Sequence, residues 1–212
     1  HLMFTTLLNF CTNDLSSFYF DIRKDSIYCD QKDSIKRRSA RTLLDILFNS
    51  LLKWLAPTLV FTCEEAWKSR GNQTSIHLED FITIDDYFKN EIINKKWKII
   101  KDVRKVITGA LEVKRGDKII KSSLEAMVNV FVSSEIISNL YDIDLAEIAI
   151  TSNVKIIESQ KPKSELFSID EIKDVFVEVK KASGNKCARC WRVLDEVKNV
   201  GEICLRCKDV VM

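Results

Sequence analysis

Four cysteines near the end of the chain constrain its folding more than any other feature. Cys187, Cys190, Cys204 and Cys207 form the pattern C-x2-C-x13-C-x2-C. Each C-x2-C pair places two thiolates on one tight turn, and two such turns complete a tetrahedral sulfur shell that suits Zn²⁺. The segment is too short to bury a core of its own. We therefore expect metal binding to supply much of its folding free energy, on the order of 10 kcal/mol.

The spacing predicts one structural Zn²⁺ ion, because four protein ligands leave no coordination position for water. Two disulfides would require an oxidising compartment, and the N-terminus carries no secretion signal. A redox C-x2-C is single, and iron–sulfur clusters use other spacings. The remaining cysteines, Cys11, Cys29 and Cys63, are expected to be thiols in a reducing cytoplasm.

The zinc knuckle expected over 183–212 also carries an aromatic side chain and several cations. Trp191 directly follows the second ligand, and the cations near the ligands are Lys186, Arg189, Arg192, Arg206 and Lys208. A tryptophan beside arginines on a rigid turn can stack an unpaired base while the arginines hold phosphate. Packing of Trp191 against the knuckle's own backbone is the alternative.

The charged residues are unevenly distributed, although the net charge is only +2. Residues 95–121 hold ten basic and three acidic side chains, and residues 180–212 hold eight basic and four acidic ones. The segment between them is acidic. Two basic blocks favour a polyanion that is touched at two places, whereas a merely solvated lysine face is the alternative.

The first half of the chain has the apolar spacing of helices, and only five glycines and two prolines occur in the whole sequence. We expect helices at 3–22, 35–55, 57–69 and 87–115. Ser34 is a cap for the second helix, and Pro57 opens the third. Residues 23–34 are predicted as a polar turn and 75–81 as an extended linker. The economical packing of four such helices is an antiparallel bundle.

The apolar period changes after Gly116, where short β-branched segments alternate with polar residues. We expect strands at 126–132, 148–150, 154–157 and 175–179, with a short helix at 134–141. The fold class is therefore predicted as mainly α. Its expected domains are a helical bundle over 1–116, a small α+β junction unit over 117–182 and the zinc knuckle over 183–212.

Nothing in the sequence indicates catalysis. There is no glycine-rich phosphate loop, and the two histidines, His1 and His77, form no nucleophile–base pair. No run of eighteen apolar residues is present, so no membrane span is expected. We therefore expect no catalytic residue and no enzymatic activity from these residues alone.

Several segments together resemble the anticodon-binding region of bacterial isoleucyl-tRNA synthetases, in the order found in that family. They read LSSFYFDIRKDSIYCD, RRSARTLLDIL, LLKWLAPTLVFTCEEAW, VITGALEVKRGDKIIKSSLEA and KCARCWRV…EICLRC. The element around LLKWLAPTLVFTCEEAW is shared more loosely by valyl and leucyl enzymes. The terminal four-cysteine knuckle after SSLEA singles out the isoleucyl family.

The resemblance implies that this chain grips the anticodon stem-loop of the isoleucine tRNA. It favours Trp191, Arg189, Arg192 and Arg206 as contacts to the anticodon loop. The catalytic domain with its HIGH and KMSKS signatures and the editing domain are absent from these residues. They are the expected partners within the same polypeptide, an ATP-dependent ligase that works as a cytoplasmic monomer.

Two further positions bear on RNA binding. Lys36, Arg37 and Arg38 open the second helix, where three cations at a helix N-terminus form a candidate phosphate site. A solvated helix face is the alternative. Lys121 stands where the resembled family usually has glycine, which puts in doubt any close contact between that loop and RNA.

Two functions from other classes remain open on the sequence alone. DNA-repair glycosylases carry a similar terminal four-cysteine finger, but they also need an N-terminal proline or comparable nucleophile. A purely structural role is the other possibility, in which the knuckle docks on another part of the protein.

Overall fold

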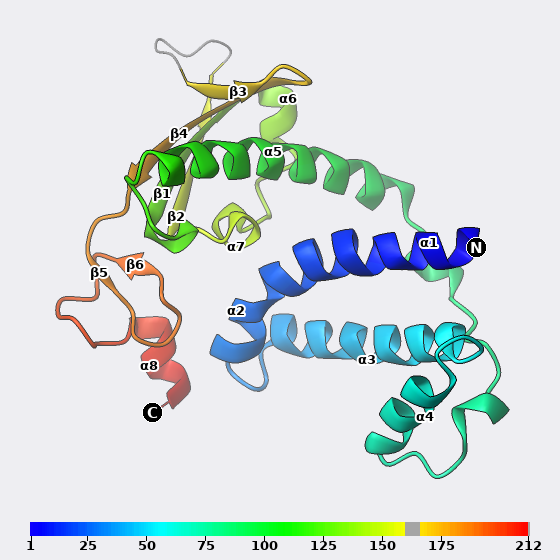
Figure 1. Cartoon of the computed structure of the whole chain (residues 1–212). Helices are drawn as coiled ribbons and strands as arrows, with labels where there is room; N and C mark the ends of the chain where they lie inside the picture. Colours follow the sequence, from blue (N-terminus) through cyan, green and yellow to red (C-terminus); the bar gives the residue numbers. More distant parts are fainter. Residues whose placement is uncertain (160–165, 212) are drawn as a thin grey trace. The chain divides into compact units, whose positions relative to one another are not determined.

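The computed structural model describes residues 1–159 and 166–211, and they form a mainly helical chain with a small mixed sheet, as predicted (Figure 1). Contacts divide the chain into two compact units. The first unit comprises residues 1–30 and 91–212, and the second comprises residues 31–90. The division predicted from the sequence, at 116 and 182, stays a prediction.

The first unit begins with consecutive helical segments. They are Leu2–Asn9 (α1), Phe10–Phe20 (η1, a π-helical stretch) and Asp21–Cys29 (α2). The prediction of a polar turn over 23–34 is wrong for most of that range. Polar side chains of α2 bind distant segments instead: Arg23 forms an ion pair with Glu147, and Asp25 forms one with Arg206. These tertiary contacts support helical structure that hydrophobic periodicity alone does not reveal.

Helix α5, Glu91–Gly116, carries the apolar stripe predicted for it. Its buried residues are Ile100, Val103, Val106, Ile107, Ala110 and Leu111. This stripe shares one core with the strands of the sheet, along which α5 runs in Figure 1. The predicted four-helix bundle did not include this contact between α5 and the sheet. An apolar stripe on a helix does not indicate whether the stripe packs against another helix or against a sheet.

The sheet has four strands in the order β2-β1-β4-β3. The strands are Ala126–Val132 (β1), Asn153–Glu158 (β2), Phe167–Ile169 (β3) and Ile172–Lys181 (β4). Strand β1 pairs parallel with β2 and antiparallel with β4. The β1–β4 register sets Val128 opposite Val179 and Val130 opposite Val177. Since side chains alternate between the faces of a strand, these valines share the buried face.

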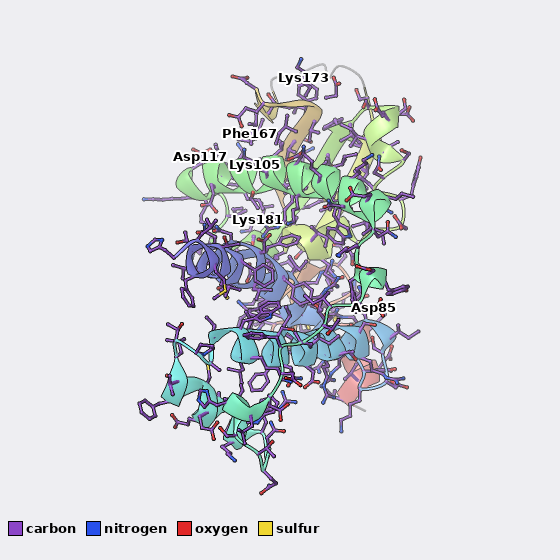
Figure 2. The ribbon with its side chains drawn as sticks, turned by 90° about the vertical axis from the view of Figure 1, so that its right-hand side faces the viewer. Asp85, Lys105, Asp117, Phe167, Lys173 and Lys181 are labelled. Carbon is purple, nitrogen blue, oxygen red and sulfur yellow. The ribbon has the colours of Figure 1, made fainter. Side chains whose placement is uncertain are left out.

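Gly109 lets α5 approach the sheet closely. A Cβ atom at this position would lie 2.8 Å from the ring of Phe167 on β3. Figure 2 shows Phe167 beside α5. A side chain at this position would displace the Phe167 ring, so glycine in the helix interior has a packing reason.

Two short helices connect β1 to β2: Ser134–Ile137 (α6) and Leu145–Ala149 (α7). The predicted strand at 148–150 is wrong, because Ile148 and Ala149 belong to α7. Ile150 ends that helix in the left-handed conformation, with φ of 56°. A three-residue apolar run does not distinguish a buried strand from the end of a buried helix.

The C-terminal segment contains a small hairpin of Asn185–Lys186 (β5) and Val193–Leu194 (β6), followed by Leu205–Val211 (α8). Gly184 precedes the hairpin with φ of 95°. A Cβ atom there would lie 2.2 Å from the Leu194 carbonyl oxygen. Glycine is therefore required for the chain to enter the knuckle.

The second unit is built on Ile35–Leu55 (α3) and Val60–Ser69 (α4), followed by the 3₁₀ turns Ile76–Leu78 (η2) and Asp86–Phe88 (η3). The predicted cap is confirmed: the Arg37 backbone N–H donates to Ser34 Oγ. The predicted linker over 75–81 contains η2, whose Ile76 packs in a buried cluster with Trp67.

No described helix is both long and apolar enough to cross a membrane.

Candidate metal centre and nucleic-acid interface

The four cysteines predicted as ligands meet in one buried cluster. All four Sγ atoms lie within 4.8 Å of one another, and Cys190 Sγ lies 3.8 Å from Cys204 Sγ. The first ligand turn spans Cys187–Cys190, and the second spans Cys204–Cys207. The Cys187 backbone N–H donates to the Arg192 carbonyl oxygen at 2.9 Å, which closes the first turn. These residues can hold one metal ion.

The backbone prepares one of the sulfur atoms for a negative charge. Burial acts to raise the pKa of the Cys187 thiol, but backbone N–H groups of Cys190 and Cys204 donate to its sulfur and lower the pKa to about 6. The distance from the Cys204 nitrogen to Cys187 Sγ is 3.3 Å. A thiolate is the form that binds metal, so this arrangement favours a metal site.

Trp191 follows the first ligand turn in the left-handed conformation, with φ of 67°. Its side chain is 58% exposed, so it does not pack inside the knuckle. The Lys186 ammonium lies 5.0 Å from the centre of the Trp191 ring. The exposed ring is therefore available for stacking, and the Lys186 ammonium lies beside it.

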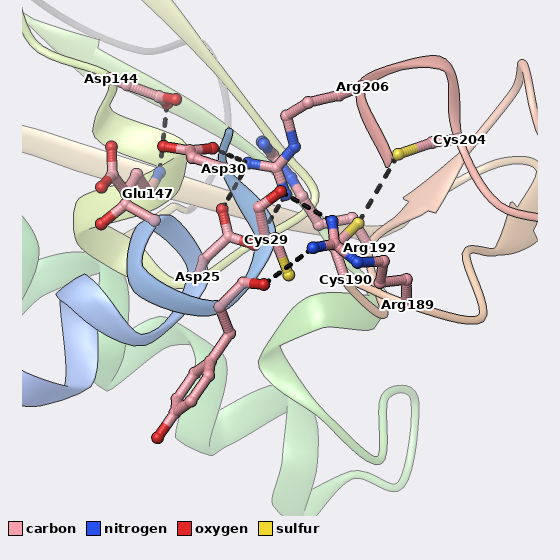
Figure 3. Close-up of polar contacts among 12 residues, drawn as sticks. Asp25, Cys29, Asp30, Asp144, Glu147, Arg189, Cys190, Arg192, Cys204 and Arg206 are labelled. Carbon is pink, nitrogen blue, oxygen red and sulfur yellow. Dashed lines mark hydrogen bonds and ion pairs between the residues drawn. The ribbon is translucent and has the colours of Figure 1, made fainter. Parts of the chain in front are cut away.

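The three arginines of the knuckle make contacts within the chain (Figure 3). Arg206 on α8 binds both carboxylate oxygens of Asp25, at 2.6 and 2.7 Å, and contacts Asp30 at 3.4 Å. Arg189 donates to the carbonyl oxygens of Cys29 and Tyr28, at 2.7 and 2.9 Å.

Arg192 joins the knuckle to the segment that precedes β2. It donates to the Ser152 carbonyl oxygen at 2.9 Å, and the Val193 backbone N–H donates to Ser152 Oγ at 2.6 Å. Ser152 is buried, and its own hydroxyl donates to the Leu124 carbonyl oxygen. The knuckle is thus bound to α2 by two arginines and to Ser152, the residue before β2, by the third.

A cavity of about 450 Å³ lies between α2, α7 and the first ligand turn. Its walls are mostly apolar and include Ile22, Leu124 and Ile150. Trp191 and Tyr28 also line the cavity, and their side chains are 58% and 73% exposed. Two exposed aromatic residues beside an apolar cavity form a surface on which a planar ring can stack.

The other predicted RNA contacts belong to other helices. Lys36, Arg37 and Arg38 occupy the first turn of α3, in the unit of residues 31–90. On α5, Lys101 forms an ion pair with Asp14, and Lys105 forms one with Glu171. The basic helix therefore directs part of its charge to partners within the chain.

Sequence reasoning missed the residues that receive the arginines. Asp25 lies in the segment predicted as a polar turn, Cys29 was expected only as a thiol, and Tyr28, Asp30 and Ser152 were not singled out. Three of these receive the bonds through backbone carbonyls, which carry no sequence signal. The repeated arginine of the two C-x-R-C turns was the available hint that both side chains share a task.

The family described as the anticodon-binding domain of tRNA ligase matches residues 1–132. The isoleucine–tRNA ligase of Rhodopseudomonas palustris is 43% identical over 202 residues, which are 93% of this chain and 20% of that protein. The corresponding enzyme of Bartonella henselae is 46% identical over 193 residues, 90% of this chain and 20% of that protein.

A third relative extends the match to almost the whole chain. The isoleucine–tRNA ligase of Gluconobacter oxydans is 44% identical over 213 aligned residues, 99% of this chain and 21% of that protein. The chain thus spans about a fifth of the length of these relatives. The match of the family to more than half of the chain identifies it: the chain belongs to the anticodon-binding domains of tRNA ligases, with isoleucine–tRNA ligases as its relatives.

Proposed function

We propose that this chain binds the anticodon stem-loop of the isoleucine tRNA. The observation that carries the proposal is the exposed Trp191 ring beside the cavity, in a chain whose relatives are isoleucine–tRNA ligases. Sequence-specific RNA binding targets unpaired loop bases that stack on aromatic side chains. An anticodon loop presents such bases.

We propose that the metal is a single structural Zn²⁺ ion bound by Cys187, Cys190, Cys204 and Cys207. A tetrahedral site with zinc–sulfur bonds of about 2.3 Å requires sulfur atoms about 3.8 Å apart. The Cys190–Cys204 sulfur distance of 3.8 Å fits this requirement. When bound, Zn²⁺ supplies no chemistry beyond holding the two ligand turns together. The side chains on those turns carry recognition.

Within this proposal, Trp191 stacks an unpaired base, and cations neutralise phosphate. Lys36, Arg37 and Arg38 at the start of α3 are the proposed phosphate site. The predicted RNA contacts of Arg189, Arg192 and Arg206 stay predictions. A guanidinium has five N–H donors, so each of these arginines would bind RNA through the donors that its bonds within the chain leave over. These contacts make the affinity fall as the salt concentration rises.

In the larger ligase that the relatives represent, we infer a positioning role. Binding the anticodon end orients the tRNA so that its acceptor end reaches a catalytic domain elsewhere in the polypeptide, which performs ATP-dependent aminoacylation in the cytoplasm. Positioning of this kind accelerates a reaction without chemistry in the binding domain. The chain is proposed to be monomeric and to lack activity on its own.

Binding of an isoleucine-tRNA anticodon stem-loop to the zinc-loaded chain tests the proposal. We expect Trp191→Ala to weaken binding about 5- to 150-fold, since base stacking on an aromatic ring is worth about 1–3 kcal/mol. The control is Tyr141→Ala, which removes an exposed aromatic ring that does not line the cavity. Equal binding of an unrelated stem-loop would contradict the specific proposal.

The two other functions predict different results. A DNA-repair glycosylase would bind or cleave a duplex with an oxidised base, and none of the three relatives named above is such an enzyme. A purely structural knuckle would leave RNA binding unchanged when Trp191 is replaced.

A further inference from the structure

The two ligand turns carry the same four-residue pattern. The first reads C-A-R-C and the second reads C-L-R-C, so Arg189 and Arg206 each stand directly before the second cysteine of a turn. Both guanidinium groups reach the same element, which is the C-terminal end of α2 (Figure 3). Two equivalent positions of the metal cluster therefore contact one helix end.

The two arginines bind complementary parts of that helix end. Arg189 donates to the Tyr28 and Cys29 carbonyl oxygens, while Arg206 binds the Asp25 carboxylate with two hydrogen bonds. The last carbonyl groups of a helix have no partner within the helix, and a cation there also interacts favourably with the helix dipole. Arg189 supplies hydrogen bonds to these carbonyl groups, and both arginines bring a positive charge to this end of the helix.

Each arginine also stands directly before a proposed metal ligand in the chain, Arg189 before Cys190 and Arg206 before Cys207. Four thiolates around a divalent ion carry a net negative charge, which the two guanidinium groups offset. Contacts of this outer kind orient ligands and tune metal affinity.

We propose that Arg189 and Arg206 are positioning residues that couple metal loading of the four-cysteine cluster to the C-terminal end of α2. The metal fixes the two turns, the turns aim the two arginines, and the arginines hold the last residues of α2. Because Tyr28 and Trp191 line one cavity from the two sides of this contact, metal loading also sets their relative position.

The coupling acts in both directions, because linked binding equilibria are reciprocal. If the metal stabilises the end of α2, then the contacts of α2 must strengthen metal binding. This inference concerns the metal proposed above and does not depend on RNA binding.

Zinc affinity of the full 212-residue chain, measured by competition with a chelator, tests the coupling. Asp25→Asn changes no residue of the knuckle and keeps the shape of the side chain, yet it removes the carboxylate that Arg206 binds. We expect this substitution to weaken Zn²⁺ binding about tenfold, as is usual when an outer contact of a metal site is lost.

A second test variant and a control variant accompany Asp25→Asn. Arg206→Lys keeps the charge but cannot form the paired bonds to Asp25, and we expect a similar loss of Zn²⁺ affinity. Lys208→Ala is the matched control on α8, because no described contact joins its side chain to α2. It should leave the Zn²⁺ affinity within twofold of the parent chain. Unchanged affinity in both Asp25→Asn and Arg206→Lys would overturn the proposal.

Hydrogen exchange measures the reverse direction of the coupling and also reports folding. Removal of Zn²⁺ should accelerate exchange at Tyr28, Cys29 and Asp30, while the middle of α5 near Val103 keeps its protection. Unchanged protection at the end of α2 after zinc removal would contradict the coupling. A chain that binds no Zn²⁺ would contradict the metal proposal itself, whereas lost RNA binding with intact zinc coupling would contradict only the proposed function.

Discussion

The knuckle of residues 183–212 and the unit of residues 31–90 are both small, but their buried side chains are of different kinds. Cysteines dominate the buried cluster of the knuckle, with Val197 as its fully buried aliphatic residue. In the other unit, Trp67, Ile76, Cys63 and Ala56 form an apolar cluster. One region thus depends on ligands for a metal and on arginine contacts, and the other depends on apolar burial.

This difference indicates how each region can be lost. Apolar burial fails gradually, by an amount set by the area that is exposed. A small metal site is lost as a whole when its ion is removed, because ion binding supplies much of the folding free energy of so short a segment. The exposed Trp191 belongs to the region that fails as a whole. The proposed stacking of an RNA base on Trp191 is therefore expected to depend on the proposed metal.

Removal of the metal should have the largest effect. We expect a chelator, or Cys204→Ser, to unfold the knuckle with a loss on the order of 10 kcal/mol of binding and folding free energy. The cluster around Trp67 should keep its structure, because it contains no proposed ligand. Residue-resolved hydrogen exchange measures both regions in one experiment, and loss of protection in both would contradict the comparison.

Trp67→Ala should destabilise the unit of residues 31–90 and leave the knuckle unchanged. Trp67 is 6% exposed, and its Nε1 donates to the Thr74 carbonyl oxygen at 3.1 Å. We expect the unit of residues 31–90 to lose about 3–5 kcal/mol of stability in denaturant unfolding. Phe61→Ala on the same helix is the control, because Phe61 is 88% exposed. Weaker Zn²⁺ binding by Trp67→Ala would show that the two regions are not independent.

A substitution in α5 tests the packing of this helix on the sheet, apart from the knuckle and the unit of residues 31–90. Gly109→Ala brings a methyl group against the Phe167 ring, and we expect a net loss of about 1 kcal/mol despite the better helix propensity of alanine. Gly116→Ala in the same helix meets no atom within 4 Å and should be neutral or slightly stabilising. Equal thermal stability of the two variants would contradict the close contact between α5 and β3.

The smallest effect is expected from Glu64, a surface carboxylate in the unit of residues 31–90. The Ile76 backbone N–H and then the Ser75 hydroxyl lower the pKa of Glu64. The contribution of Glu64 to the free energy of unfolding is therefore present above its unfolded pKa of about 4.3. This contribution is lost as the pH falls through the lower pKa of the folded state. Glu64→Gln should weaken this acid dependence, measured by unfolding at several pH values. An unchanged acid dependence in Glu64→Gln would contradict this role of Glu64.

Patterns that depend on local spacing were predictable from the sequence. The helix Ile35–Leu55 with its Ser34 cap, the strand Ala126–Val132 and the grouping of the four cysteines follow the prediction closely. Each of these features is encoded within a few residues, by periodicity, by a capping side chain or by ligand spacing.

Features that depend on distant partners were not predictable in the same way. Helix α2 extends to Cys29 although its sequence is polar, and its Asp25 meets an arginine far along the chain. The cluster of arginines was interpreted as a phosphate-binding set, because composition does not reveal that their acceptors lie within the chain. Exposure of Trp191 was likewise a property of the fold and not of the sequence.

In the proposed function, a metal-held knuckle presents Trp191 to an anticodon loop. Its most direct test compares the affinity of the isoleucine-tRNA anticodon stem-loop for the chain before and after zinc removal. We predict that zinc removal weakens binding at least as much as Trp191→Ala does, and that restored zinc recovers the affinity. Undiminished binding by the zinc-free chain would contradict the account.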